Sequence, residues 1–254
     1  MRLEEMSWPT VSSVSRDAAV VVPIAAVEQH GAHLPVFTDS MLLGEVVRRS
    51  AEVLGDEVVW APLLWLGNSH HHMDFPGTLS AAPRTYLDVL GDLIENMLTH
   101  GFRRIVLLNG HGGNIVPASQ AVFEARQRHR QRTDLLLLSA TYWLLGSQPT
   151  DLGPGFVQNS MGHACEWETS MILKLAPRLV GEIDAIEPVS MGDPFEPASR
   201  GWITKDRSAP GHIGDPRQAS AEKGEILFSR FSEDVAAFLK RVASWDGRSW
   251  GSEK

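Results

Sequence analysis

The segment that decides the fold is "AAVVVPIAAVEQHGAHLPVFTD", residues 18–39, where a long apolar run leads directly into acids and histidines. The run over residues 18–27 has the length and the Val-rich composition of a buried strand. Glu28 and His30 follow two residues apart, so extended backbone would project both side chains to the same side. Ionisable groups are costly to bury unless something pairs them, and a metal ion is the obvious candidate.

Similar apolar runs recur along the chain with amphipathic stretches between them. This alternation is typical of an α/β fold with a mostly parallel sheet covered on both faces. Strands are expected over residues 18–27, 57–61, 104–109 and 134–139, and helices over residues 40–54, 84–100, 116–130, 165–175 and 219–244. The 254 residues suit a single domain, in which the Gly-, Pro- and Asp-rich segment 177–216 is an irregular excursion or a lid over the site.

Charge and cysteine content narrow the classes of function. The net charge is -8 and no basic run occurs, so no nucleic-acid partner is expected. No apolar run approaches the ~20 residues of a membrane span, so no membrane partner is expected either. The single cysteine, Cys165, excludes an internal disulfide, and the N-terminal "MRLEEMSWPTVSS" carries two acids where a signal peptide would be basic. These features predict a cytoplasmic protein.

The connection after the first predicted strand offers a further acid. Gly31 allows the chain to turn sharply, and Asp39 lies near the start of the next predicted helix. Asp39 is either the N-cap of that helix or a partner of Glu28 and His30 in one site. His33 fits neither the strand phase nor a cap, so it is expected to be structural. Connections at the carboxyl ends of parallel strands are where open α/β sheets place their ligands.

A second strand leads into the glycine-rich turn "NGHGGN", residues 109–114, with His111 at its tip. The backbone amides of Gly112, Gly113 and Asn114 are candidates for substrate binding, because glycines permit close approach of the backbone to an anion. A phosphate-binding loop is the alternative, but the P-loop lysine and the G-x-G-x-x-G pattern are both missing.

The stretch "MGHACEWETS", residues 161–170, adds a histidine and two acids. On a helix, His163 and Glu166 are three residues apart and share a face, whereas Glu166 and Glu168 point about 200° apart. Glu166 is therefore expected to join His163, and Glu168 to make supporting hydrogen bonds, unless an irregular helix start reverses the two. A solvated acidic first turn is the alternative. Cys165 is expected to pack in the core rather than act as a nucleophile.

Three consecutive histidines stand in "GNSHHHMDFPGTLS", residues 67–80. Adjacent side chains cannot all face one point in regular structure, so one or two at most contribute to a site. His72 is the candidate for substrate contact.

Together, "VEQHGAHLP", "TD", "FPGT", "NGHGGN" and "GHACEWETS" resemble the creatininase (creatinine amidohydrolase) family, in the same order and at similar spacings over residues 18–175. The resemblance implies a three-layer α/β/α fold and a site for two divalent metal ions, with zinc, manganese or iron as the usual metals. It also implies hydrolysis of an amide, often a cyclic one, and assembly as a homo-oligomer such as a hexamer.

Carried over position by position, the resemblance makes Glu28 and His111 ligands of one metal, His30 a ligand of the other, and Asp39 the bridge. Creatininases carry a glutamate ligand where this chain has Gly113. Glu166 is the predicted replacement for that ligand, because creatininases lack an acid at its position.

A second departure concerns the substrate. Creatininases carry a Trp-Asp pair shortly before the histidine that matches His163, where this chain has Asn159 and Ser160. This difference argues against creatinine as the substrate. Other branches of the family deformylate a formylaminopyrimidine nucleotide or trim a peptide during mycofactocin maturation, and the "NGHGGN" form is more similar to those branches.

The function predicted from these residues is metal-dependent hydrolysis of a linear or cyclic amide C–N bond in a small molecule other than creatinine. A metal-bridged hydroxide would attack the carbonyl, and His163 would donate a proton to the leaving nitrogen, with Glu168 orienting it or passing the proton. One alternative is a metal-stabilised binding or scaffold protein that lost turnover with the change at Gly113. Another is a sugar- or nucleotide-binding α/β enzyme that uses residues 109–114 as an anion loop.

Overall fold

A sheet of four parallel strands forms the centre of the computed structural model, which describes residues 1–146, 155–195, 197–248 and 250. The strands run in the order β2-β1-β3-β4, with neighbours in parallel register. Their bounds are Ala19–Ile24 for β1, Val58–Trp60 for β2, Arg104–Asn109 for β3 and Leu136–Thr141 for β4. The prediction of a mostly parallel sheet is confirmed, and each strand lies where the apolar runs placed it.

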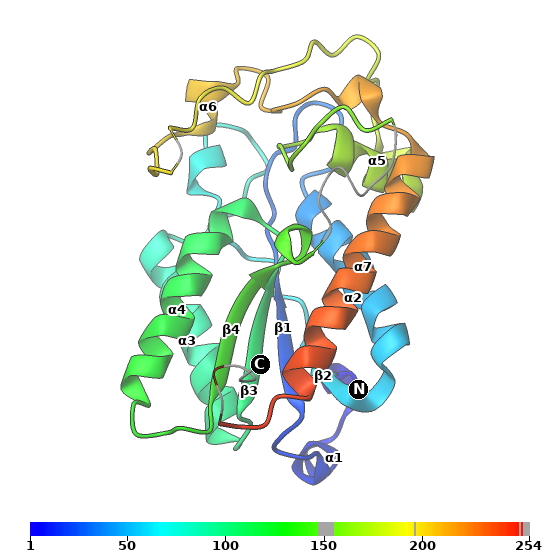
Figure 1. Cartoon of the computed structure of the whole chain (residues 1–254). Helices are drawn as coiled ribbons and strands as arrows, with labels where there is room; N and C mark the ends of the chain where they lie inside the picture. Colours follow the sequence, from blue (N-terminus) through cyan, green and yellow to red (C-terminus); the bar gives the residue numbers. More distant parts are fainter. Residues whose placement is uncertain (147–154, 196, 249, 251–254) are drawn as a thin grey trace.

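Helices cover both faces of the sheet (Figure 1). Their bounds are Trp8–Ser13 for α1, Thr38–Leu54 for α2, Pro83–Thr99 for α3, Ile115–Arg128 for α4, Glu166–Leu175 for α5, Thr204–Arg207 for α6 and Ala221–Ala243 for α7. Short 3-10 helices span Leu3–Glu5, Gly55–Glu57, His70–His72, Gly112–Asn114, Tyr142–Leu144, Pro177–Leu179 and Pro216–Gln218. Helices α3 and α4 pack on one face, and α2 and α7 on the other, so the fold has the predicted three layers.

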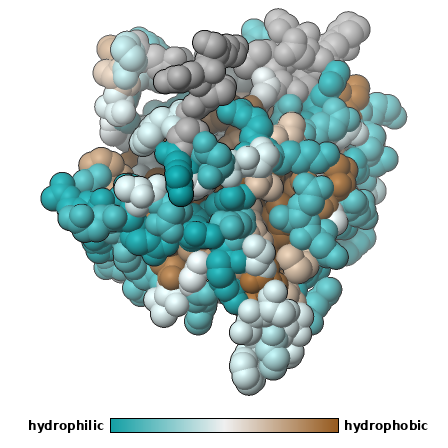
Figure 2. Space-filling model, turned by 60° about the horizontal axis from the view of Figure 1, so that its bottom comes forward, coloured by the Kyte–Doolittle hydropathy of each residue, from teal (hydrophilic) through white to brown (hydrophobic). Residues whose placement is uncertain are grey.

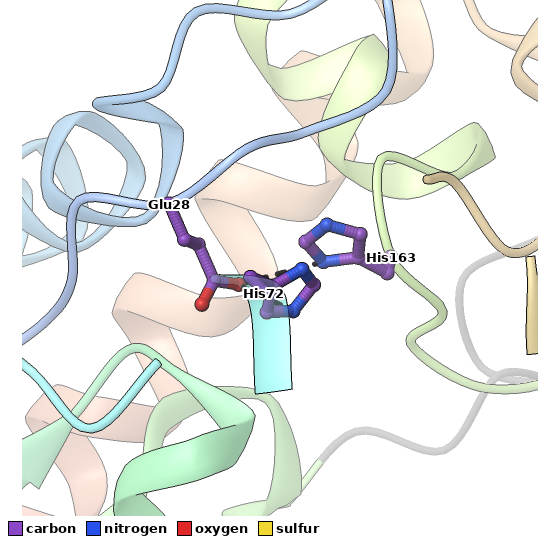
Figure 3. Close-up of side chains that lie close together, drawn as sticks. All are labelled: Glu28, His72 and His163. Atoms are coloured by element: carbon purple, nitrogen blue, oxygen red, sulfur yellow. Dashed lines mark ion pairs between the residues drawn. The ribbon is translucent and has the colours of Figure 1, made fainter. Parts of the chain in front are cut away.

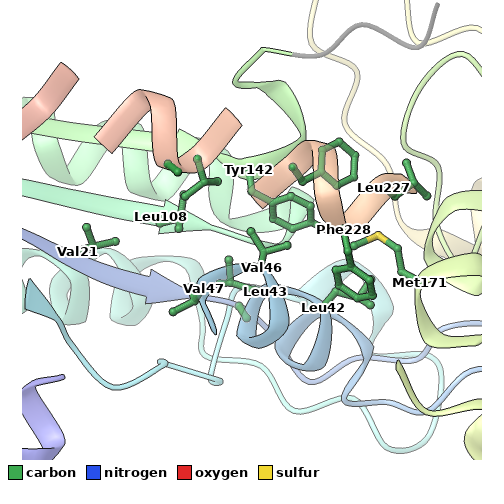
Figure 4. Packing of buried hydrophobic residues seen from close by; sticks show 14 of the residues in the cluster. Val21, Leu42, Leu43, Val46, Val47, Leu108, Tyr142, Met171, Leu227 and Phe228 are labelled. Carbon is green, nitrogen blue, oxygen red and sulfur yellow. The ribbon is translucent and has the colours of Figure 1, made fainter. Parts of the chain in front are cut away.

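Alternation along the strands explains the layers. In β3, Val106 and Leu108 join the core under α2, α5 and α7, whereas Ile105 and Leu107 join the core under α3 and α4. Successive side chains of a strand point to opposite faces, so a strand buried on both faces reads as a continuous apolar run. Figure 4 shows the first core, where Phe228 of α7 lies among side chains of α2 and α5.

The strand order places a topological switch point between β1 and β3. The chain leaves β1 through α2 to reach β2 on one side, and then returns through α3 to β3 on the other side of β1. In sheets of this kind the crevice beyond the carboxyl ends of the two central strands binds the ligand. The residues that follow these two strands are 25–37 and 110–114, which carry two of the sequence motifs.

The segment 177–216 runs over the carboxyl ends of the strands, coloured yellow at the top of Figure 1. Apart from residue 196, which lies outside the described residues, its structure is irregular except for two short helices. Paired backbone hydrogen bonds join Val189 to Gly214, and the Gly181 N–H donates to the His33 carbonyl at 2.8 Å. The organisation of the whole chain as one domain stays a prediction.

Hydrophilic residues cover most of the face seen in Figure 2, and hydrophobic ones lie between them in separate patches. Within the described part of the chain, no helix is both long and apolar enough to cross a membrane.

Truncation of the core between the sheet and α7 is expected to destabilise the fold. Phe228 is fully buried, so Phe228→Ala should lower the free energy of unfolding by about 3–5 kcal/mol. The matched control is Phe123→Ala on α4, where the side chain is 59% exposed and little burial is lost. Urea denaturation of both variants at equal metal content measures the difference. Equal stability of the two variants would contradict the packing described here.

Candidate metal centre

Asp39 lies between two histidines that follow different strands. Its Oδ1 is 3.1 Å from His30 Nε2, and its Oδ2 is 2.9 Å from His111 Nδ1. His30 follows β1, His111 follows β3, and Asp39 belongs to the first turn of α2, whose N-cap residue is Phe37. The structure therefore favours the site over the N-cap as the role of Asp39. All three side chains are buried.

Hydrogen bonds to backbone carbonyls fix which nitrogen of each histidine faces Asp39. His30 Nδ1 lies 3.0 Å from the Glu28 carbonyl, and His111 Nε2 lies 3.1 Å from the Asn68 carbonyl. Because a carbonyl oxygen only accepts, these nitrogens carry the protons. His30 Nε2 and His111 Nδ1 then present their lone pairs to the centre, an arrangement that is usual for histidines bound to metals.

Two carboxylate oxygens at the centre have no hydrogen-bond partner among the described residues. They are Glu28 Oε2 and Asp39 Oδ2, and both are buried. Asp39 Oδ2 is close to His111 Nδ1 but is not aligned for a hydrogen bond. Two ligand atoms that share one ion at about 2 Å are about 3 Å apart at tetrahedral or octahedral angles. The separation and the lack of partners both fit ligands of a metal ion.

The negative charge of the buried carboxylates also favours the binding of cations. Burial raises the pKa of Glu28 to about 7, against the opposing effect of His111. Burial would lower the pKa of His111, but Glu28 and Asp39 outweigh it and raise that pKa to about 9. Burial would raise the pKa of Asp39, but His30 and His111 hold it below its usual range. Protons thus balance part of the carboxylate charge without metal, a role that divalent ions can take over.

The structure corrects the roles expected for the two acids of α5. The Glu166 carboxylate accepts hydrogen bonds from the backbone of Val157 and Gln158 and lies 2.7 Å from Lys223 Nζ. It belongs to none of the described groups that could hold a metal. Glu168 does belong to such a group, with its Oε1 3.7 Å from His30 Nε2. Contrary to the expectation, the structure thus places Glu168, and not Glu166, in a described group that could hold a metal.

The reason lies in where the helix begins. Helix α5 starts at Glu166, and His163 precedes it in a segment where Ala164 has a positive φ of 47°. His163 and Glu166 are therefore not on one helical face. Instead, the Ala164 N–H donates to the Glu168 carboxylate at 2.5 Å and directs that side chain back towards the centre.

His72 and His163 approach the other side of the Glu28 carboxylate (Figure 3). His72 Nε2 is 3.3 Å and His163 Nδ1 is 3.6 Å from Glu28 Oε1, and the two rings lie 4.4 Å apart. His163 Nε2 donates to the Gln29 carbonyl at 2.7 Å, which leaves Nδ1 facing the cluster. Burial, with His30 nearby, holds the pKa of His163 well below its usual value, so this imidazole is neutral at pH 7.

Gln29 forms hydrogen bonds that orient these two histidines, although no role was predicted for it from its position after the strand. Its Oε1 accepts from the Gly31 N–H, and its Nε2 donates to the Gly211 carbonyl, so the amide has one orientation. The second Nε2 hydrogen can then go to His72 Nδ1, at 2.7 Å. In that tautomer His72 Nε2 carries a proton and faces Glu28 Oε1 at 3.3 Å, so it has no lone pair for a metal.

The centre opens into a cavity of about 630 Å³, within the size range of small-molecule sites. His72, His163, Gly112 and Gly113 line it, together with Glu168. A Cβ on Gly113 would collide with the Asn68 carbonyl oxygen and with the His111 ring, so a glutamate does not fit there without a backbone shift.

Asn114 is not among the residues that line this cavity. Its side chain accepts from the Asn68 N–H at 2.9 Å and donates to the Ala25 carbonyl at 3.0 Å. The His111 N–H is likewise used internally, at 3.0 Å from Asn109 Oδ1. These internal bonds count against an anion loop over residues 109–114.

Two further residues have the structural roles expected from the sequence. Cys165 is buried, and burial raises the pKa of its thiol to about 12, so it is not a nucleophile at neutral pH. His33 Nε2 lies 3.0 Å from the Thr169 hydroxyl, and His33 belongs to none of the described metal-binding groups.

Two residues over the cavity, Trp202 and Arg207, were not predicted from the sequence. His71, Trp202 and Arg207 all line it. The His71 and Trp202 rings are 4.9 Å apart, and the Arg207 guanidinium lies 4.7 Å from the Trp202 ring centre. Trp202 and Arg207 come from the irregular segment 177–216, where no periodic pattern could place a side chain.

Comparison with known proteins agrees with this architecture. The family model described as "Creatininase: Creatinine amidohydrolase" matches residues 4–239. Over 252 residues the chain is 29% identical to a creatinine amidohydrolase of Pseudomonas putida, covering 93% of this chain and 95% of that protein. It is 30% identical over 228 residues to a mycofactocin precursor peptide peptidase of Mycolicibacterium smegmatis, covering 87% of this chain and 84% of the relative.

Solved structures extend the likeness to three dimensions. A mutant creatininase complexed with creatine matches with a TM-score of 0.81 and 28% identity, over 96% of this chain and 99% of that one. Further creatininase structures, each with a TM-score of 0.80, are described as a Zn-Zn form and as a Mn form. With the family match over most of its length and a cluster suited to divalent ions, the chain belongs to the creatininase family of metal-dependent amidohydrolases.

Proposed function

We propose that this protein hydrolyses the C–N bond of a small-molecule amide other than creatinine, with two divalent metal ions bound per subunit. The observation that carries the proposal is the position of Asp39, whose two carboxylate oxygens face His30 and His111 on opposite sides. A single carboxylate that reaches two histidines in this way is suited to bridge two ions. Zinc and manganese are the metals named for creatininase structures, and iron is the remaining candidate.

The proposed ligands form two half-sites around Asp39. Glu28 and His111 are assigned to one, because they share a described group that could hold a metal and Glu28 Oε2 has no hydrogen-bond partner there. His30 and Glu168 belong to the other. Three carboxylates provide three negative charges, which two divalent ions more than balance. When bound, such ions activate water and polarise the amide carbonyl.

His163 is the proposed proton carrier, and its environment refines how it acts. Because its pKa is held low, His163 is neutral before the reaction. It can donate to the leaving nitrogen only after Nδ1 has taken up a proton earlier in the cycle. The hydrogen bond from Nε2 to the Gln29 carbonyl holds the ring in the orientation that exposes Nδ1.

The cellular location and the oligomeric state of the protein do not follow from the geometry of the metal centre. A reducing compartment, such as the cytoplasm, suits a chain with a single buried cysteine. A homo-oligomer stays a prediction from the family resemblance.

Metal analysis with a hydrolysis assay tests the function directly. The protein purified without a polyhistidine tag should contain close to two divalent ions per chain and should hydrolyse members of a panel of linear and cyclic amides. Chelation should abolish hydrolysis and lower the melting temperature, and adding the metal back should restore both. Hydrolysis that survives complete metal removal would overturn the proposal. Stoichiometric metal without turnover on any amide would favour the binding or scaffold alternative.

The two acids of α5 form a matched pair for assigning the ligand. Glu168→Gln should lower the metal content by about one ion per chain, with activity reduced at least about 100-fold. Glu166→Gln should keep both ions but lower the free energy of unfolding by about 3 kcal/mol, because it leaves Lys223 without its charged partner. Elemental analysis and urea denaturation of the two variants measure these effects. Loss of metal from Glu166→Gln alone would reverse the assignment.

Replacement of the proton carrier should separate chemistry from metal binding. His163→Asn is expected to lower kcat by about 10²–10⁴-fold while both metal ions stay bound, since His163 is proposed to move a proton rather than to be a ligand. Steady-state kinetics and elemental analysis on the same preparation check this. Wild-type kcat in the variant, or a lost metal ion, would exclude the role.

A further inference from the structure

Two arginines over the cavity have no acidic partner among the residues that the structure describes. Arg200 and Arg207 form no ion pair with any described carboxylate, although the structure pairs many other surface arginines. Within the described part of the chain, each donates a single hydrogen bond: Arg207 to the Met191 carbonyl at 2.7 Å, and Arg200 to the Asp193 carbonyl at 3.3 Å. Since a guanidinium has five N–H groups in a fixed fork, most of these donors remain available.

Two acids of the described part of this segment accept hydrogen bonds in local turns. Asp193 Oδ1 accepts from the Phe195 N–H at 2.8 Å, and Asp206 Oδ2 accepts from the Ile203 N–H at 3.1 Å. The pKa of Arg207 is lowered by burial and by the positive charge of Arg200. Two like charges beside each other without a counter-ion are unfavourable, and an anion that arrives with the substrate would relieve them.

The arginines are continuous with the metal centre. The 630 Å³ cavity adjoins a second one of about 880 Å³, and both are lined by Ile115, Met191, Arg200, Gly201, Trp202 and Arg207. A chain of ring contacts connects the two ends: His111 to His71 at 5.8 Å, His71 to Trp202 at 4.9 Å, and Trp202 to the Arg207 guanidinium at 4.7 Å. A substrate that extends from the metal centre to Arg207 therefore needs to be no longer than these three contacts laid end to end.

We infer that the substrate of this site carries an oxyanion group, a carboxylate or a phosphate, which Arg207 and Arg200 bind beside Trp202 while the amide lies at the metal centre. Guanidinium forks bind both groups through two parallel hydrogen bonds, so the two sources share one chemistry. The inference rests on the proposed amide hydrolysis and names the class of amide. A purely structural role for Arg207 would need only its bond to Met191 and its contact with Trp202.

Binding of matched probes to the metal-loaded protein tests this inference. The probes need a chain between amide and anion that is long enough to span the three contacts. 6-Acetamidohexanoate carries a carboxylate, 6-acetamidohexanamide is its neutral counterpart, and the phosphate monoester of 6-acetamidohexanol carries the other anion. Calorimetric titration should show one of the anionic probes binding at least about tenfold more tightly than the neutral one, and the preferred anion identifies the source.

Arginine variants assign that preference. The double variant Arg200→Gln with Arg207→Gln should reduce the ratio to about one, whereas Arg230→Gln on α7, an exposed arginine, should leave it unchanged. Arg207→Lys should keep part of the preference, which a role in packing alone would not predict. Equal binding of the neutral and anionic probes, no detectable binding of either anion, or a preference that survives the double variant would each overturn the inference.

A parallel hydrolysis assay separates this inference from the proposed function. If the arginine-dependent preference is found but no amide is cleaved, the amidohydrolase proposal fails and the anion site stands. If amides are cleaved equally with and without an anionic group, and the double variant cleaves them as the wild type does, the anion site fails and the amidohydrolase proposal stands.

Discussion

Three carboxylates buried at the carboxyl ends of β1 and β3 are the constraint on which the rest of the structure depends. Glu28, Asp39 and Glu168 would repel one another in a low-dielectric interior unless positive charge lay among them. Histidines supply part of that charge when protonated, but they also present lone pairs when their outer nitrogens are held by carbonyls. The same cluster is therefore stable with protons and ready for metal ions.

This constraint explains why the metal centre lies between the ends of β1 and β3. A ligand set drawn from β1, β3, α2 and α5 is brought together only where the strand order reverses, because that is where connections diverge to both faces of the sheet. The continuous apolar strands fix β1 beside β3 with no freedom of register, since a shift would displace every buried side chain. The precision of the centre thus comes from the core beneath it.

The part of the site that the sequence could predict is the part that regular structure positions. Strand phase and the position of a strand end were enough to bring Glu28, His30, Asp39 and His111 together. The rest of the site could not be predicted because the backbone is locally irregular. Ala164 adopts a left-handed conformation that usually requires glycine, so the sequence does not indicate it. Because of this conformation, His163 and Glu166 do not have the helical spacing that was assumed. Arg207 was missed because the excursion that carries it follows no period, so only the folded chain shows where its side chain lies.

The proposed transfer of a metal ligand from position 113 to Glu168 on α5 would change what the site can hold. A glutamate side chain in the turn after His111 would take up space in the lining of the cavity. Gly112 leaves that space open, and Gly113 lets the backbone at Asn68 approach closely. Glu168 reaches the centre from the opposite side, anchored by the Ala164 N–H. With Glu168 as the proposed ligand, the acid of the metal centre would come from α5 and would leave the turn at residues 112–113 free of a side chain. The loss of the acid at Gly113 is best understood as a change in the room given to the substrate, with the charge of the centre maintained.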